Sequence, residues 1–195
     1  MRKIFLITIC IILITGVVIL YKTKQDDRPS YLVDTHQEYD LDLDNKNELL
    51  YFHTKEVKFG NWTTEVFVNN SVKPVLIVSG LLKDYRVYDI AENIRILELE
   101  ISAGGKLVNS LLYKYHEGFL VRVPIAIDSN SQLWDVWSSG GAEFKDLDDD
   151  GVLEMLVYHR NYPPKANRRV EAYRFEDNIF QKYKEYKEAT EEIYL

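Results

Sequence analysis

The sequence predicts a mainly β protein made of about three antiparallel, blade-like repeats behind one N-terminal transmembrane helix, with a short helix at the C-terminus. The first observation is that short runs of alternating apolar and polar residues lie between Gly, Asn and Asp turns, which is typical of half-buried strands. Aromatic residues make up 13% of the chain and favour pleated surfaces. The second is a pattern that recurs after about 50 residues, a period typical of propeller-like or stacked β architectures.

The N-terminal element is an apolar segment that contains no charged residue from Ile4 to Tyr21. At about 1.5 Å per residue it covers roughly 27 Å, close to the hydrocarbon thickness of a bilayer. No Ala-x-Ala cleavage pattern follows it, so an uncleaved anchor is favoured over a signal peptide. A lipoprotein signal fits poorly, because Thr8 and Ile9 precede Cys10. We therefore predict a membrane anchor over residues 1–21.

The rest of the chain divides into a linker, residues 22–38, and a repeat domain, residues 39–195. The linker is polar, contains Pro29 and has no sustained apolar period. Strands are predicted within residues 74–78, 95–101, 106–115 and 119–123. The tail, residues 182–194, is rich in Lys and Glu and carries tyrosines that could share one face, so a short helix is predicted there.

Two acidic segments define the repeat. In each, three aspartates alternate, a turn residue follows, a glutamate stands eight residues after the first aspartate, and an apolar strand begins. The two sets are Asp40, Asp42, Asp44 and Glu48, and Asp146, Asp148, Asp150 and Glu154. Glu98 marks a third copy midway that has lost its acidic loop. His53 and His159 each follow a loop glutamate by five residues, and we expect them to share a packing role.

The acidic segments are candidate calcium sites. Alternate carboxylates on a turning backbone direct hard oxygens to one centre, as Ca²⁺ requires, and their mutual repulsion favours a bound cation. Gly151 allows the tight turn, and a backbone carbonyl near Val152 would add a ligand. In the first loop Lys46 takes this place, Asn45 replaces the glycine, and weaker binding is expected. Strands flank the loops, so neither is an EF-hand. The alternative is a solvated acidic turn.

The motif Asp-x-Asp-x-Asp-Gly-x-x-Glu, followed by an apolar strand and an aromatic strand, resembles the FG-GAP/VCBS repeat family. The resemblance covers about residues 39–186, and is stronger in the last repeat than in the first. It implies β-propeller blades and calcium ligands at the two acidic sets. A closed propeller generally needs at least four blades. Three repeats therefore imply an open blade stack, or closure by a homodimer.

Charge and cysteine content exclude several classes of function. Without residues 1–21, the chain carries 22 basic and 31 acidic side chains. Such an acidic body does not bind nucleic acid through bulk electrostatics. The only cysteine lies in the apolar segment, which excludes a disulfide framework or a thiol nucleophile in the body. A Gly-x-Ser-x-Gly nucleophile motif is also missing.

These observations predict a non-enzymatic, calcium-binding β-repeat module, anchored in the cell membrane with its body outside the cytoplasm. There it would bind a protein or a glycan whose identity the sequence does not reveal. Weak calcium sites fill at extracellular calcium concentrations, which favours the outer side. Two alternatives stay open: an inhibitor or sensor of a secreted enzyme, and a hydrolase that uses paired carboxylates.

Overall fold

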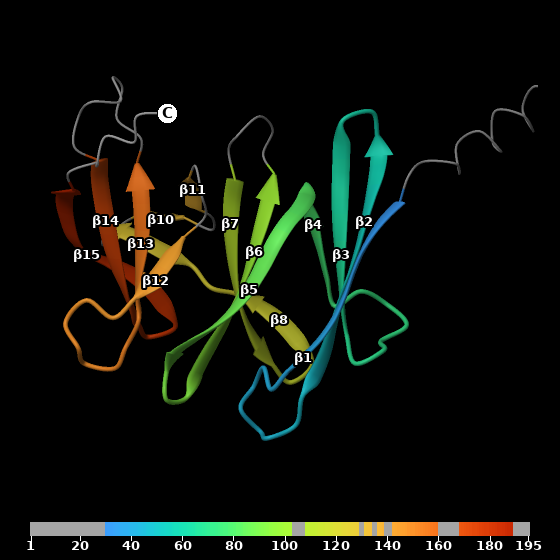
Figure 1. Ribbon diagram of the computed structural model, residues 1–195, viewed down its shortest axis with the longest axis horizontal. Coiled ribbons are helices and arrows are strands. Elements are labelled where there is room, and N and C mark those ends of the chain that lie inside the picture. The colour runs from blue at the N-terminus through green and yellow to red at the C-terminus, as the bar shows by residue number, and fades with distance from the viewer. Residues whose placement is uncertain are drawn as a thin grey trace, which may run out of the picture.

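The computed structural model describes residues 30–102, 108–128, 131–133, 136–138, 142–159 and 168–188. These residues form three sheets that lie side by side (Figure 1). The prediction of a mainly β fold is confirmed, and the described part of the chain contains no helix. The predicted anchor, residues 1–21, lies outside the described residues. Among those that are described, none forms a helix of the length and hydropathy needed to cross a bilayer.

The first sheet is an antiparallel meander in the order β1-β2-β3-β4. Its strands are β1 (Ser30–Tyr39), β2 (Glu48–Lys58), β3 (Asn61–Val68) and β4 (Leu76–Ser79). Residues 30–38, which the sequence placed in the linker, form nearly all of β1. They pair with β2 from Ser30 opposite Lys55 to Tyr39 opposite Glu48. Backbone pairing with a neighbouring strand therefore orders a segment that has no apolar period of its own.

The second sheet contains β5 (Leu81–Ala91), β6 (Ile94–Ser102), β7 (Val108–His116), β8 (Phe119–Arg122) and β11 (Val136–Ser138). Strands β5 to β8 follow the same meander, and β11 pairs with the other half of β7. A tight turn at Glu92 and Asn93 joins β5 to β6. Glu98 is the fifth residue of β6, whereas Glu48 and Glu154 each begin a strand. The prediction that Glu98 is the third equivalent glutamate is therefore wrong.

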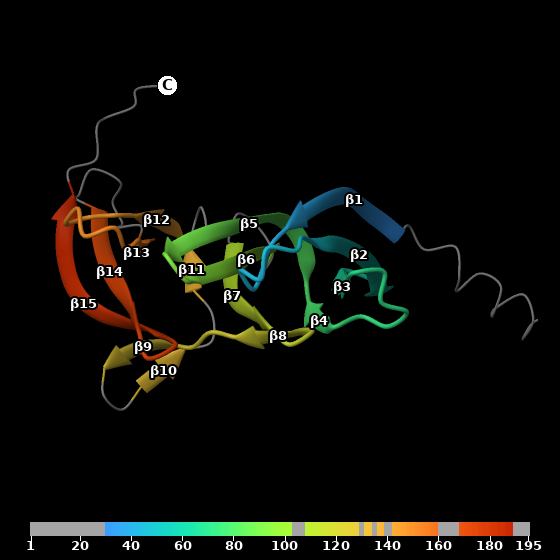
Figure 2. The same cartoon turned by 90° about the horizontal axis from the view of Figure 1, so that it is seen from below.

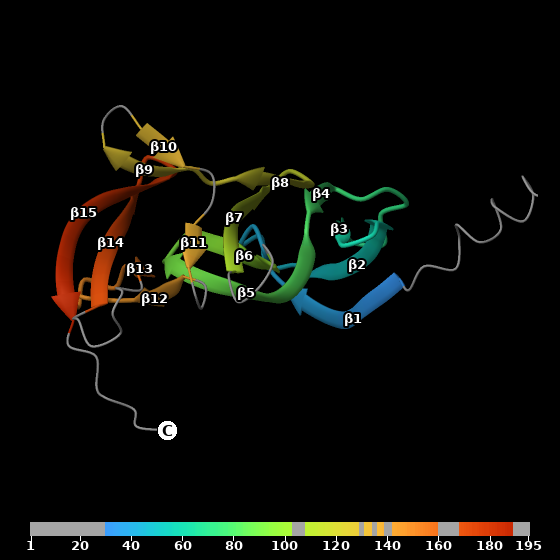
Figure 3. The same ribbon diagram turned by 90° about the horizontal axis from the view of Figure 1, so that it is seen from above.

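The third sheet contains β12 (Glu143–Lys145), β13 (Glu154–His159), β14 (Arg168–Glu176) and β15 (Ile179–Glu188), with β9 (Ile125–Asp128) and β10 (Ser131–Leu133) added at its edge. β9 pairs in parallel with β15. The segment between β8 and β12 thus adds a hairpin to the third sheet and then returns as β11 to the second. Strands β9, β10 and β11 thus connect the second sheet to the third. The three sheets do not close into a ring (Figures 2 and 3).

The predicted C-terminal helix is wrong for residues 182–188, which belong to β15, and residues 189–195 lie outside the described residues. β15 pairs with β14 along its whole length, with a bulge that places Tyr183 opposite no partner. Tyr186 packs on the outer apolar cluster of this sheet. Backbone pairing with β14 along the strand outweighs the weak helix propensity of the Lys and Glu residues.

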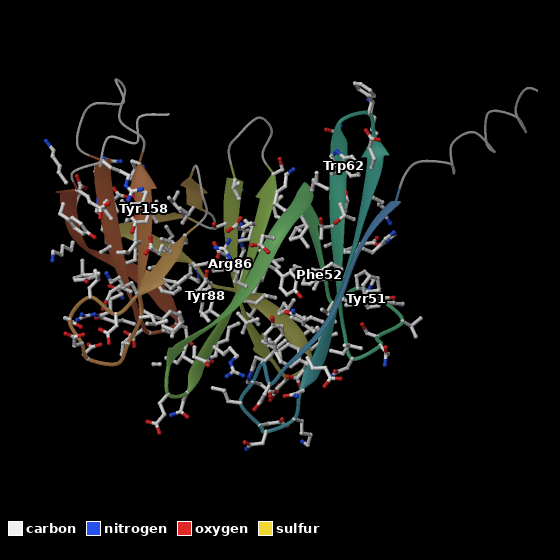
Figure 4. All side chains as sticks on the ribbon, viewed as in Figure 1. Tyr51, Phe52, Trp62, Arg86, Tyr88 and Tyr158 are labelled. Carbon is white, nitrogen blue, oxygen red and sulfur yellow. The ribbon has the colours of Figure 1, made fainter. Side chains whose placement is uncertain are left out.

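Two apolar cores hold the sheets together. The first lies between the first and second sheets and contains Phe52, whose ring packs on Tyr85 with centroids 4.5 Å apart. The second lies between the second and third sheets, where Tyr88 meets Phe144 at 4.2 Å (Figure 4). β6 contributes Leu97 to the first core and residues on its other face to the second. A strand covered on both faces explains its continuous run of buried side chains.

Gly80 makes the connection between the first two sheets possible. It stands between β4 and β5 with φ +121°, a conformation that L side chains rarely adopt. A Cβ atom there would lie 2.1 Å from Cγ2 of Ile101. The close approach of these two sheets therefore requires glycine at this position.

Candidate metal centre

Each acidic loop joins an edge strand of a sheet to the strand that pairs with it. One connects β1 to β2 and the other connects β12 to β13. Figure 1 shows them at the same end of the molecule, beside the tight turn between β5 and β6. The three sheets are thus aligned, and the two loops occupy equivalent places, as the sequence repeat predicts.

A buried glutamate fixes the base of each loop. Glu48 is 6% exposed and its Oε2 accepts the backbone N–H of Leu41 at 2.7 Å. Glu154 is fully buried and its Oε2 accepts the N–H of Leu147 at 2.8 Å. Burial raises the pKa of the Glu48 carboxyl, with the three aspartates of its loop adding to the rise. A cation beside Glu48 would offset this cost.

The first aspartate of each loop closes the turn. The N–H groups of Asp44 and Asn45 donate to the Asp40 carboxylate at 2.9 and 3.0 Å. The equivalent N–H groups of Asp150 and Gly151 donate to Asp146 at 3.2 and 2.9 Å. These backbone donors, Gly151 foremost, lower the pKa of Asp146. Left-handed residues stand at matching places, Leu43 and Asn45 in one loop and Asp149 and Gly151 in the other.

The third aspartate of each loop folds back onto the backbone. Oδ1 of Asp44 accepts the N–H of Lys46, and Oδ1 of Asp150 accepts the N–H of Val152, both at 2.8 Å. Three carboxylates remain close together in each loop: Asp40, Asp42 and Glu48, and Asp146, Asp148 and Glu154. Within each set, one oxygen per residue lies within 4.8 Å of the others. Each cluster could therefore hold a metal ion. The ligand roles expected for Asp44, Asp150 and the Lys46 and Val152 carbonyls stay predictions.

The cations near the two clusters differ. Arg174 of β14 reaches into the second cluster, where its Nη2 lies 2.5 Å from Oδ2 of Asp148 and 3.0 Å from Oε1 of Glu154. Its Nε donates to the same Glu154 oxygen at 3.1 Å, and Asp150 lies 3.9 Å away. These carboxylates raise the pKa of Arg174, the hydrogen bond with Glu154 most of all. A guanidinium therefore already stands among the carboxylates expected to bind metal.

Among the residues that the structure describes, no arginine side chain pairs with the three carboxylates of the first cluster. The strand that pairs with β2 ends at Val68, which lies opposite Leu50, and the next two residues are Asn69 and Asn70, so the first sheet places no cation there beside Glu48. The ammonium group of Lys46 contacts Asp44 at 2.7 Å, at the exposed rim and outside the cluster. Arg95 donates to the backbone carbonyl of Asp40 and pairs with Asp89 at 2.5 Å. The carboxylates of Asp40, Asp42 and Glu48 are thus free of the internal competitor that Arg174 supplies to the second cluster.

Sequence reasoning missed Arg174, because no repeated signal marks it. It also missed Glu65 and Glu171. His53 Nδ1 lies 3.0 Å from Glu65, and His159 Nε2 lies 2.8 Å from Glu171. The two histidines lie on separate sheets, β2 of the first and β13 of the third, and the packing role expected for them stays a prediction. A His followed by a Glu twelve residues later in both repeats is the signal that could have found these pairs.

Glu98 lies within the buried strand β6 and not in a loop. It is fully buried between the second and third sheets. Its Oε2 accepts the Tyr88 hydroxyl at 3.2 Å, and its Oε1 accepts the N–H of Ala142 at 3.1 Å. This carboxylate thus links two sheets near the second core.

Comparison of the chain with protein-family models, with curated proteins and with solved structures gave no match. The likeness to FG-GAP/VCBS repeats therefore depends on the loop motif alone.

Proposed function

We propose that the protein is a membrane-anchored module of the FG-GAP/VCBS type whose two acidic loops bind calcium outside the cytoplasm. The observation that carries this proposal is the pair of carboxylate clusters with the same hydrogen-bonding frame at one end of the molecule. Their donors are all hard oxygens on loops flanked by strands. Such donors suit Ca²⁺, whereas Mg²⁺ demands shorter, near-octahedral geometry and retains its waters.

The module would act by binding a protein or a glycan at the cell surface. The first aspartate and the glutamate of each acidic loop accept hydrogen bonds from the backbone of their own loop. This supports a binding role for these residues over hydrolysis. Bound calcium would rigidify the loop end of the first and third sheets, and a rigid surface loses less conformational entropy when a partner binds. An inhibitor or sensor of a secreted enzyme would use the same surface.

Calcium is expected to raise the melting temperature of the full-length chain in detergent. Ligand that binds only the folded state adds about 2.7 kcal/mol at a hundredfold excess over its dissociation constant. For a chain of this size that corresponds to several degrees, since 1 kcal/mol is worth roughly 2–4 °C. The measurement is thermal unfolding with Ca²⁺, with Mg²⁺ and with chelator. The order of affinities proposed for the two loops is the reverse of the one expected from the sequence: Asp42→Ala should remove more of the calcium effect than Asp148→Ala, because Arg174 competes only in the second cluster. Identical melting temperatures in all three conditions would contradict the proposed calcium sites and indicate that the loops are solvated acidic turns.

The location of the body is tested separately. Protease added to intact cells, or to protoplasts, should digest the body while a cytoplasmic marker protein survives. A body that is digested only after the membrane is broken would contradict the extracytoplasmic assignment.

A further inference from the structure

The turn between β2 and β3 exposes apolar side chains to solvent. In this hairpin tip, residues 57–62, Phe59 is 98% exposed and Val57 is 53% exposed. Trp62 follows at the start of β3, where Figure 4 shows it near the outer end of the strand. A phenylalanine held almost wholly in water at the end of a two-stranded projection gains no burial within the described part of the chain.

Local geometry makes the tip project. The register of β2 and β3 shifts between Glu56 and Lys58, so Val57 is the extra residue of a bulge. Gly60 has φ +76°, and its N–H donates to Oε1 of Glu56 at 2.6 Å. The bulge and this closed turn fix the direction of the tip.

The tip lies at the end of the first sheet where the chain enters it. Ser30 pairs with Lys55, so Phe59 extends four residues, or about 13 Å, beyond the start of β1. Only residues 22–29 separate Ser30 from the predicted anchor, and eight residues span at most about 28 Å. The tip therefore points toward the side from which the anchored chain arrives, within reach of the bilayer surface.

Charge favours the same orientation. The acidic loop before Glu48 lies at the opposite end of β2, about 33 Å from Lys58. That distance is several Debye lengths at physiological salt. An anionic membrane repels the loop end of this acidic body, whereas the tip carries Lys58 beside its aromatic residues. Trp, Phe and Lys are the residues enriched at membrane interfaces.

We propose that the hairpin tip inserts Phe59 into the membrane interface and holds the acidic loops away from the bilayer. This inference depends on the proposed anchor at residues 4–21. The partner that the hairpin tip contacts is a lipid surface, because the anchor keeps that surface within reach of the tip.

The test uses the full-length chain with Cys10→Ser, so that one introduced cysteine can carry an environment-sensitive fluorophore. The label is placed at Asn61→Cys in the tip, or at Val72→Cys as the matched control. Val72 is 95% exposed in the turn at the other end of the same sheet. Each protein is reconstituted into phosphatidylcholine–phosphatidylglycerol vesicles with and without nitroxide-labelled lipid.

Nitroxide lipid should quench the label at position 61 at least about twofold more than the label at position 72. Adding Phe59→Ser should reduce quenching at position 61 to the level at position 72, whereas adding Val72→Ser should leave it unchanged. Equal quenching at both positions would overturn the docking. So would quenching at position 61 that Phe59→Ser does not change. So would self-quenching that rises with the protein-to-lipid ratio, which would indicate a second copy at the tip.

Alkaline extraction of the same vesicles separates the two proposals. Protein that stays with the lipid while position 61 is no more quenched than position 72 retains its anchor and refutes the docking. Protein that is extracted refutes the anchor, and the docking with it.

Discussion

Arg174→Gln is expected to make the stability of the protein depend strongly on calcium. Without calcium, the substitution leaves the fully buried Glu154 without its guanidinium partner. Removing one member of a buried pair typically costs about 3–5 kcal/mol. Arg174 is itself partly exposed, with 28% of its side chain accessible, so a cost of about 1–3 kcal/mol is expected. With calcium, the ion takes the place of the guanidinium and restores the melting temperature.

Calcium affinity of the second cluster should rise in the same variant. The ion no longer displaces a cation bonded to Asp148 and Glu154. A charge-assisted bond worth about 1.5–3 kcal/mol corresponds to roughly 10- to 150-fold tighter binding. Calorimetric titration and thermal unfolding measure the two effects.

Lys46→Gln is the matched control, because this exposed lysine touches only the rim of the first cluster. It should change calcium affinity by less than about threefold. If calcium raises the melting temperature of Arg174→Gln by no more than that of the parent, Arg174 is a structural partner of Glu154 and the second cluster binds no metal.

The Glu171 carboxylate is expected to set the acid limit of folding. Burial opposes its ionisation, but Lys182 Nζ at 2.7 Å, His159 Nε2 at 2.8 Å and the Tyr173 hydroxyl at 2.9 Å outweigh burial. Together they lower the pKa of Glu171 to about 2 from an ordinary 4.5. A depressed pKa stabilises the folded state above the ordinary pKa. That stabilisation is lost as pH falls toward 2, and it amounts to about 3 kcal/mol at most.

Glu171→Gln should therefore lower the free energy of unfolding at pH 7 by up to about 3 kcal/mol. The difference from the parent should shrink as pH falls from 4.5 to 2. Carboxyls common to both proteins, including Glu48 and Glu100 with pKa values raised by burial, cancel in this difference.

Denaturant unfolding at a series of pH values measures the effect. Glu65→Gln is the matched control. Glu65 occupies the equivalent place in the first sheet, where Lys55 and His53 lower its pKa, and its side chain is more exposed than that of Glu171. A smaller, parallel effect is expected there. A constant difference between Glu171→Gln and the parent down to pH 3 would show that this carboxylate does not control acid unfolding.

The features that local sequence predicts are those that short-range interactions encode. The acidic loops are closed by hydrogen bonds between residues two to seven apart, such as Asp40 with Asn45 and Glu48 with Leu41. Their spacing therefore predicted both the loop frames and the strands that follow. Alternation of apolar residues likewise predicted β6, β7 and β8, because the two faces of a strand are visible in its own sequence.

Which distant segments meet depends on packing and pairing between strands that no local pattern reveals. Arg174 lies 26 residues from Asp148, and β3 of the first repeat carries no arginine, so no repeated pattern indicates the guanidinium in the second cluster. The residues of β15 have helix-forming composition, yet they form a strand because β14 supplies partners for their backbone groups. The parallel pairing of β9 with β15 joins segments more than fifty residues apart. Helix propensity differs by fractions of a kcal/mol per residue, and backbone pairing with a neighbouring strand outweighs it. Local sequence thus determined the loops, and packing between sheets decided what surrounds them.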